Sequence, residues 1–375
     1  MSMSSPNSAP QSLLQRLFKL QEHGTTVRTE LIAGVTTFLT MVYIIFVNPQ
    51  ILAAAHMDIK AVFVTTCLIA AFGSILMGLV ANLPIAVAPA MGLNAFFAFV
   101  VVGAMGYSWQ VAMGAIFWGA VGLFLLTLFR IRYWIIAHIP LSLRVGITSG
   151  IGLFIAMMGL KNSGIIIPNN DTIVTIGNFA SHNVLLGALG FFIIAILAAR
   201  NIHAAILISI IITTVIGLLL GDVQYQGIFD IPPSIAPVVG QVDIVGALDI
   251  GLSGVIFAFM LVNLFDSSGT LIGVTDKAGL TDDKGKFPRM KQALYVDSLS
   301  SVAGSAMGTS SVTAFIESTS GVSVGGRTGL TAVVVGILFL LAIFLSPLAG
   351  MVPSYATAGA LIYVGVLMTS SLTRV

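Results

Sequence analysis

Long apolar runs separated by short polar breaks extend over most of the chain. Because a helix needs about 20 mostly apolar residues to cross a bilayer, these runs predict membrane spans. Twelve of them follow one another, near residues 31–50, 61–82, 84–102, 109–130, 145–160, 184–199, 203–221, 254–276, 293–308, 309–326, 328–350 and 353–370. The predicted fold is therefore an all-α polytopic membrane protein in a lipid bilayer. Composition agrees, since 57% of the 375 residues are hydrophobic and only 8% are charged.

The polar breaks differ in charge, and this predicts the orientation. With the N-terminus inside, only Lys60 and Lys161 of the basic residues fall outside, as the positive-inside rule requires. The stretch 222–253 contains four aspartates and no Lys or Arg, which is typical of an extracytoplasmic loop. We therefore expect a multi-pass protein of the cell inner membrane with a cytoplasmic N-terminus and a soluble N-terminal tail over 1–24.

Charge and cysteine content narrow the function classes. A net charge of +2 gives no reason to expect nucleic acid as a partner. Cys67 is the single cysteine and lies in an apolar run, so a disulfide framework or a cysteine-based metal site is excluded. We expect no cofactor and no metal.

Four stretches of the first half recur in the second half in the same order. The pairs are residues 34–44 with 254–264, 61–74 with 293–305, 94–97 with 313–316, and 145–147 with 364–366, and the last two share a spacing of 219 residues. Seven spans separate the copies, and an odd number turns the second copy upside down. We predict a first inverted repeat over 25–221 and an incomplete second one over 254–375. Inverted repeats are typical of secondary transporters, with the substrate site at the midplane.

The third and tenth spans have sequences that a continuous helix tolerates poorly. The third begins with Pro84, Pro89 and Gly92, and the tenth is rich in Ser, Thr and β-branched residues. We expect an extended segment followed by a half-helix in each, with the two segments crossing near the bilayer centre. The alternative is a pair of kinked packing helices. Irregular backbone at this depth is tolerated where it lines a cavity, so the crossing is the predicted binding site.

Three acids lie within predicted spans, namely Asp266, Asp297 and Glu317. A charged carboxylate at this depth costs at least ~2.5 kcal/mol, which makes each one a functional hypothesis. Since no Lys or Arg lies deep in a span, we expect a proton or a ligand as their partner. The alternative is a carboxyl that only forms hydrogen bonds to backbone groups between helices. For Asp297, which lies in a serine-rich helix, such a packing role and a functional role are equal alternatives.

The residue types near the crossing suit a particular ligand chemistry. A carboxyl group and the amide of Asn94 can pair with adjacent donors and acceptors on the edge of a planar purine, and Phe96, Phe265 or Phe315 could stack on its face. Two acids and an amide without a basic group favour a neutral or cationic ligand over an anion.

Four motifs resemble the bacterial purine permeases of the nucleobase/cation symporter family, in the azaguanine-resistance branch and nearest its adenine-type members. They are TTFLTMVY (36–43), APAMGLNA (88–95), FDSSGT (265–270) and IES (316–318). The resemblance covers essentially the whole chain. It implies fourteen spans in two inverted sevens, with core and gate domains and the purine between spans 3, 8 and 10. By position it assigns binding and coupling to Asn94, Asp266 and Glu317. The predicted substrate site comprises these three residues with Thr313, Phe96 and Phe265, and the predicted proton-coupling residues are Asp266 and Glu317.

The implied function is proton-coupled uptake of a purine nucleobase by alternating access, with adenine as the expected substrate. A homodimer is a further expectation. This chain departs from the family by stopping after twelve spans, so either the sequence is shortened or transport is poor. Alternatives are a guanine/hypoxanthine-preferring permease and an anion transporter of the sulfate-permease type. An enzyme is not expected, because no nucleophile with a paired base accompanies the acids.

Overall fold

The computed structural model describes residues 13–138, 141–282, 287–370 and 372, and most of them are helical. The α-helices are α1 (Leu13–Leu17), α2 (Val27–Met41), α3 (Ile44–Ala53), α4 (Ile59–Leu76), α5 (Met91–Ala95), α6 (Trp109–Leu128), α7 (Ile131–His138), α8 (Leu141–Asn162), α9 (His182–Ala199), α10 (Ala205–Leu220), α11 (Ser253–Lys277), α12 (Met290–Ala306), α13 (Ser318–Ser323), α14 (Gly329–Ala342), α15 (Ser346–Met351) and α16 (Ser354–Thr369). Two π-helical segments, η1 (Met77–Ala81) and η2 (Phe96–Ala104), extend α4 and α5. The 3-10 turns are η3 (Gly246–Leu248), η4 (Ile250–Leu252) and η5 (Ile343–Leu345).

Each predicted span corresponds, in order, to one or more of these elements. Seven of the helical stretches are long and apolar enough to cross a membrane, and three shorter apolar helices accompany them. The remaining two spans are α12 and the segment around α13, which are more polar. The polytopic helical fold predicted from the sequence is confirmed.

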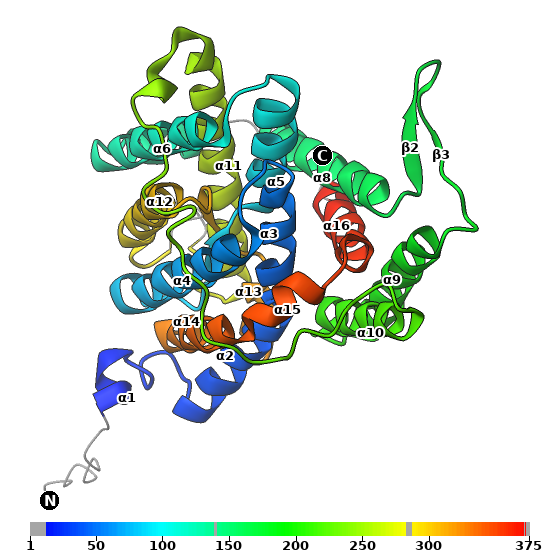
Figure 1. Ribbon diagram of the computed structural model, residues 1–375. Coiled ribbons are helices and arrows are strands. Elements are labelled where there is room, and N and C mark those ends of the chain that lie inside the picture. The colour runs from blue at the N-terminus through cyan, green and yellow to red at the C-terminus, as the bar shows by residue number, and fades with distance from the viewer. Residues whose placement is uncertain (1–12, 139–140, 283–286, 371, 373–375) are drawn as a thin grey trace, which may run out of the picture.

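The helices form two groups, which Figure 1 shows side by side. In the smaller group, the gate domain, α16 packs against α8, α9 and α10. In the larger group, the core domain, α4 and α2 pack against α14, and α6 packs against α11 and α12. Glycines let the gate helices approach closely, because a Cβ atom on Gly365 would lie 2.4 Å from the carbonyl oxygen of Gly152.

Two short strands cross in the interior of the core domain. Strand β1 (Val87–Pro89) pairs with β4 (Val312–Ala314) in antiparallel register, with Ala88 opposite Thr313. Every residue of both strands is buried. Each strand is followed by a short helix, α5 or α13, so the predicted extended segment and half-helix are confirmed in both broken spans. The alternative of two kinked but continuous helices is excluded.

The inverted repeat extends to single side chains on the helices that precede the strands. The Ser74 hydroxyl of α4 accepts a hydrogen bond from the Val87 N–H (3.0 Å) and donates to the Val87 carbonyl (3.2 Å). Ser301 of α12 does the same with Val312, at 3.3 and 2.6 Å. Two serines in equivalent places thus orient the first residue of each strand.

One part of the sequence alignment between the repeats is wrong. Residues 94–97 were matched to 313–316, yet Asn94 lies in helix α5 whereas Thr313 lies in strand β4. Val87 corresponds to Val312, which gives a spacing of 225 residues in place of 219. Thr313 is therefore equivalent to Ala88 within the strand, and the match of 94–97 with 313–316 reflects a shared Ala-Phe pair that occupies different places in the two repeats.

Residues 13–24 of the predicted N-terminal tail pack in part on the core domain, and residues 1–12 lie outside the described part of the chain. Phe18 and Leu20 are buried and pack against Leu330 of α14. Asn82 joins the two parts, because its side chain donates to the Phe18 carbonyl (3.1 Å) and accepts from the Gly329 N–H (2.8 Å). Two apolar residues within a polar stretch are therefore enough to dock this segment on the core domain.

Two further features lie between predicted spans. A hairpin of β2 (Ile166–Asn169) and β3 (Ile173–Ile176) connects α8 to α9 and projects at the edge of the gate domain in Figure 1. The stretch predicted as an extracytoplasmic loop, 222–253, contains irregular chain with the short turns η3 and η4.

Candidate functional site

Glu317 lies three positions after the last residue of strand β4 and is the N-cap residue of α13. The chain therefore leaves the strand crossing at this carboxyl group. Tyr43, at the break between α2 and α3, donates its hydroxyl to Glu317 Oε1 at 2.6 Å. The backbone near the carboxyl is fixed from the other repeat, because the Ala86 N–H donates to the Ser318 hydroxyl (3.0 Å). Glu317 is thus held by groups from both halves of the chain.

Asp266 lies in the middle of α11, which packs against β4 and α13. Its carboxyl accepts a hydrogen bond from the Thr313 hydroxyl and interacts electrostatically with Glu317 and Asp297. The structure therefore brings Asp266, Thr313 and Glu317 together at the strand crossing. Both carboxyls are half-buried, and among the described residues neither forms an ion pair within 4.0 Å.

Asp297 has a basic partner, contrary to the expectation that no Lys or Arg neutralises the membrane acids. Arg132 Nη2 lies 2.8 Å from Asp297 Oδ2, and both side chains are fully buried. The Ser267 hydroxyl donates to the other carboxylate oxygen. Arg132 stands just after the fourth span, and the turn between α6 and α7 carries it to α12. No local pattern predicts this pair, because 165 positions separate the two residues along the chain.

The ion pair is bound to several neighbouring groups. Arg132 Nη1 donates to the Ser298 hydroxyl (3.1 Å), and Nη2 donates to the Ser268 hydroxyl (3.3 Å). Further hydrogen bonds offset part of the free energy that is lost when the two charges of such a pair are removed from water. Asp297 is therefore a structural acid, whereas Asp266 and Glu317 have no basic partner in the part of the chain that the structure describes.

Asn94 lies in α5 within a fully buried polar network. Its Nδ2 donates to Asn48 Oδ1, and Asn48 Nδ2 donates to the hydroxyls of Thr66 (2.8 Å) and Thr309 (3.2 Å). The network links α3, α4, α5 and the approach to β4. Within the described part of the chain, Asn94 Oδ1 has no hydrogen-bond partner. A buried amide oxygen without a donor is costly, so it is available to a ligand donor.

The aromatic residues predicted to stack on a ligand lie in two different places. The Phe96 ring packs edge-on against Phe259 of α11, with 5.3 Å between ring centroids. Phe259 precedes Asp266 by seven positions, about two helical turns, so this pair lies along the same side of α11. Phe265 packs instead in an apolar cluster with Leu123 and Leu264. The binding roles of Phe96 and Phe265 stay predictions.

Three residues of this region were not singled out from the sequence. Tyr43 belongs to the motif at 36–43. Its position within a membrane span indicates a functional or structural partner, because a phenol hydroxyl at that depth needs a hydrogen-bond partner. Asn48 offered a similar signal as an amide within a span. Arg132 offered none, since it reads as an ordinary loop cation. Among the described residues, no three His, Cys, Asp or Glu side chains are grouped as a metal site would require.

The buried strand crossing between inverted repeats and the separate group of gate helices form the architecture of a membrane transporter. Two solved structures share this fold. The transmembrane domain of a cyanobacterium bicarbonate transporter BicA superposes with a TM-score of 0.68 at 16% identity, covering 91% of this chain and 89% of that one. The murine Slc26a9 anion transporter gives 0.65 at 11% identity, covering 99% and 66%.

The profile of the Permease family named Xan_ur_permease matches residues 28–375, and the chain belongs to this family. It is 78% identical to the adenine permease AdeP of Escherichia coli K12 over 97% of this chain and 82% of that one. It is 45% identical to the guanine/hypoxanthine permease PbuG of Bacillus subtilis, over 96% and 85%. The protein is therefore a multi-pass membrane transporter, and the expectation that it is not an enzyme is confirmed.

Proposed function

We propose that this protein takes up adenine together with protons across the inner membrane. The observation that carries the proposal is the pair of carboxyls, Asp266 and Glu317, held without a basic partner where the two repeats cross. The 78% identity to an adenine permease supports adenine over guanine or hypoxanthine, whose permeases are more distant. The basic residues near the span ends support a cytoplasmic N-terminus.

The chemistry of adenine fits these groups. Its amino group and ring N–H are donors, and its ring nitrogens are acceptors, so one carboxyl can pair with two adjacent atoms of its edge. Glu317 engages Tyr43 through Oε1, which leaves Oε2 to accept from the base. Asp266 is bonded by Thr313 and can exchange a proton. An anion at this place would meet two carboxyls and is disfavoured.

The test is a binding and competition measurement on the purified chain. We expect adenine to bind at least about tenfold more tightly than hypoxanthine or guanine, a difference of ~1.4 kcal/mol. We expect sulfate not to compete. Tighter binding of guanine or hypoxanthine would make the protein a permease for those bases, and displacement of adenine by sulfate would refute the proposal.

Asn94→Ala is expected to weaken adenine binding about tenfold and to alter the ranking of adenine against hypoxanthine and guanine. The substitution removes the free amide oxygen and also the donor to Asn48, and each unpaired buried group costs ~1–3 kcal/mol. Competition against labelled adenine measures both effects. Asn183→Ala, at an exposed position of α9, is the matched control. Unchanged affinity and ranking would show that Asn94 only packs.

A further inference from the structure

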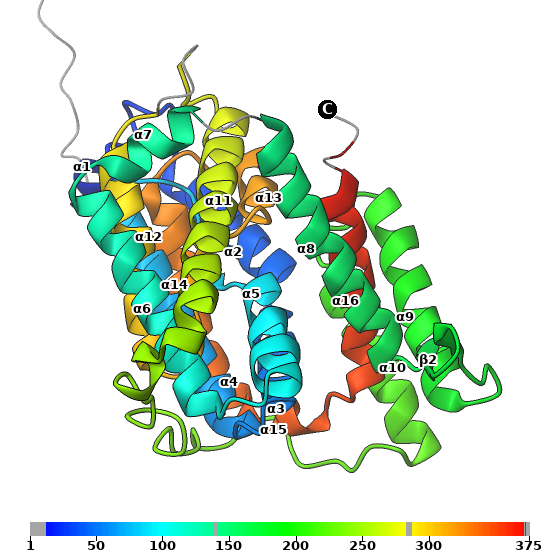
Figure 2. The same ribbon diagram turned by 90° about the horizontal axis from the view of Figure 1, so that it is seen from above.

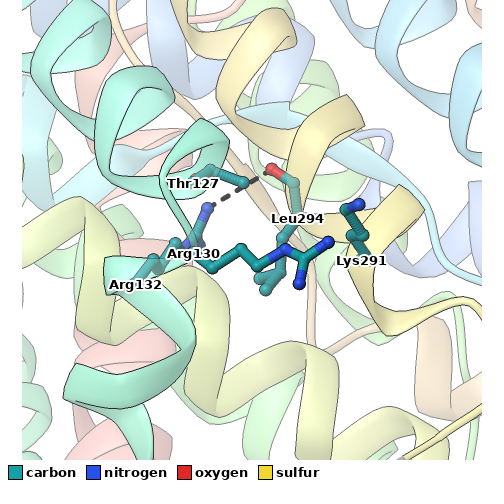
Figure 3. A pocket seen from close by; sticks show the side chains of 5 residues that line it. All are labelled: Thr127, Arg130, Arg132, Lys291 and Leu294. Carbon is teal, nitrogen blue, oxygen red and sulfur yellow. Dashed lines mark hydrogen bonds between the residues drawn. The ribbon is translucent and has the colours of Figure 1, made fainter.

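A cavity lies apart from the strand crossing, where α6 ends, α7 begins and α12 begins. Its volume is about 440 Å³, within the ~300–1,000 Å³ typical of ligand sites. Five residues line it, as Figure 3 shows: Thr127, Arg130, Arg132, Lys291 and Leu294. Figure 2 places α7 at the same end of the bundle as α1, opposite α15. The charge pattern of the sequence predicts that this end is cytoplasmic.

The lining of the cavity has an excess of positive charge. Three of its five residues are basic and none is acidic. Asp297 neutralises Arg132, whereas Arg130 and Lys291 form no ion pair within 4.0 Å with a described residue, and both are exposed. This is the opposite of the strand crossing, which presents two carboxyls. The two sites therefore suit ligands of opposite charge.

The local structure holds the basic groups around the cavity. Arg130 adopts a left-handed backbone conformation (φ 62°), which turns the chain from α6 into α7 and brings Arg130 and Arg132 to the same cavity. The Lys291 ammonium lies 5.8 Å from the centre of the Tyr295 ring, one helical turn along α12. A cation placed over an aromatic ring is stabilised in that position.

One buried donor at this cavity is left over. Arg132 uses Nη1 and Nη2 for Asp297 and the neighbouring serines, whereas its Nε is buried without a hydrogen-bond partner among the described residues. Arg132 is fully buried. An unsatisfied donor on a fully buried side chain points to an acceptor that the chain itself does not provide.

We propose that this cavity binds a phosphate group. Arginine and lysine together are the usual partners of phosphate, the first through its planar fork and the second as a point charge. A basic pocket at the cytoplasmic end of membrane helices suits the head group of an anionic phospholipid and equally a free phosphate.

The experiment compares two double variants of the full chain in neutral detergent. Arg130→Gln/Lys291→Gln removes the two exposed charges of the cavity. Arg200→Gln/Lys277→Gln removes two exposed charges from the ends of α9 and α11, so the net charge changes equally. Native mass spectrometry measures retention of phosphatidylglycerol against phosphatidylcholine. Calorimetry measures inorganic phosphate against chloride at equal ionic strength.

The parent is expected to bind phosphatidylglycerol or inorganic phosphate, and the arm that responds identifies the source. The cavity variant should lose about tenfold or more in that affinity, and the control should stay within about twofold. The proposal is overturned if the parent binds neither ligand, or if both variants lose affinity equally. Should the cavity variant fail to fold, Lys291→Gln alone carries the test. Adenine binding is measured separately, so failure here leaves the proposed function untouched.

Discussion

Glu317→Ala is expected to lower adenine affinity by about a hundredfold or more, which corresponds to ~2.7 kcal/mol. The alanine removes the acceptor that we assign to the polar edge of the base, and an unpaired buried group costs ~1–3 kcal/mol. The substitution also leaves the Tyr43 hydroxyl, now 2.6 Å from the carboxyl, without its acceptor. Two losses at one place make this the largest expected effect on binding. Calorimetric titration of the purified variant with adenine measures it.

The control for this variant is Glu22→Ala. That carboxyl is exposed and paired with Lys19 at the surface, so its loss should leave adenine affinity within about twofold of the parent. Thermal melting of both variants shows whether the fold is retained. If Glu317→Ala binds adenine as tightly as the parent, then Glu317 is not part of the binding site.

Asp266→Asn is expected to abolish accumulation of adenine while adenine still binds. The amide keeps the size of the side chain and its contact with Thr313, but it cannot release or take up a proton. In our proposal Asp266 is protonated from the outer side and loses the proton inside. A gradient of one pH unit provides ~1.4 kcal/mol per proton, enough for about tenfold accumulation. The variant should accumulate none, although exchange of adenine across the membrane persists.

Proteoliposomes with an imposed pH gradient provide the measurement. Asp276→Asn is the matched control, since Asp276 lies on the same helix at an exposed position. This control should concentrate adenine as the parent does. Should Asp266→Asn also concentrate adenine under the gradient and stop when the gradient is collapsed, coupling lies elsewhere, and Glu317 becomes the next candidate.

The features that the sequence predicted well are those that depend on local pattern. Apolar runs predict spans because the bilayer requires a certain length of apolar helix. The prolines before Asn94 and the polar run before Glu317 predict broken helices, since both oppose a regular helix at that depth. These local rules were enough for the helical fold, the inverted repeat and the strand crossing.

The features that the sequence did not predict depend on contacts between distant residues. Arg132 reaches Asp297 only because a turn folds α7 back towards α12. The docking of Phe18 on α14 depends on a surface that exists only after folding. The orientation in the membrane, the binding roles of Asn94, Thr313, Phe96 and Phe265, and a homodimer stay predictions, because no ligand, membrane or partner chain fixes them.

The antiparallel pairing of β1 with β4 has a consequence for insertions and deletions. Side chains alternate between the two faces of a strand, so one residue added within β4 would turn Thr313 away from Asp266. The same insertion would separate Val312 from the Ser301 hydroxyl that orients it. Chain length at the crossing should therefore be fixed among related permeases, whereas the hairpin between α8 and α9 can vary in length.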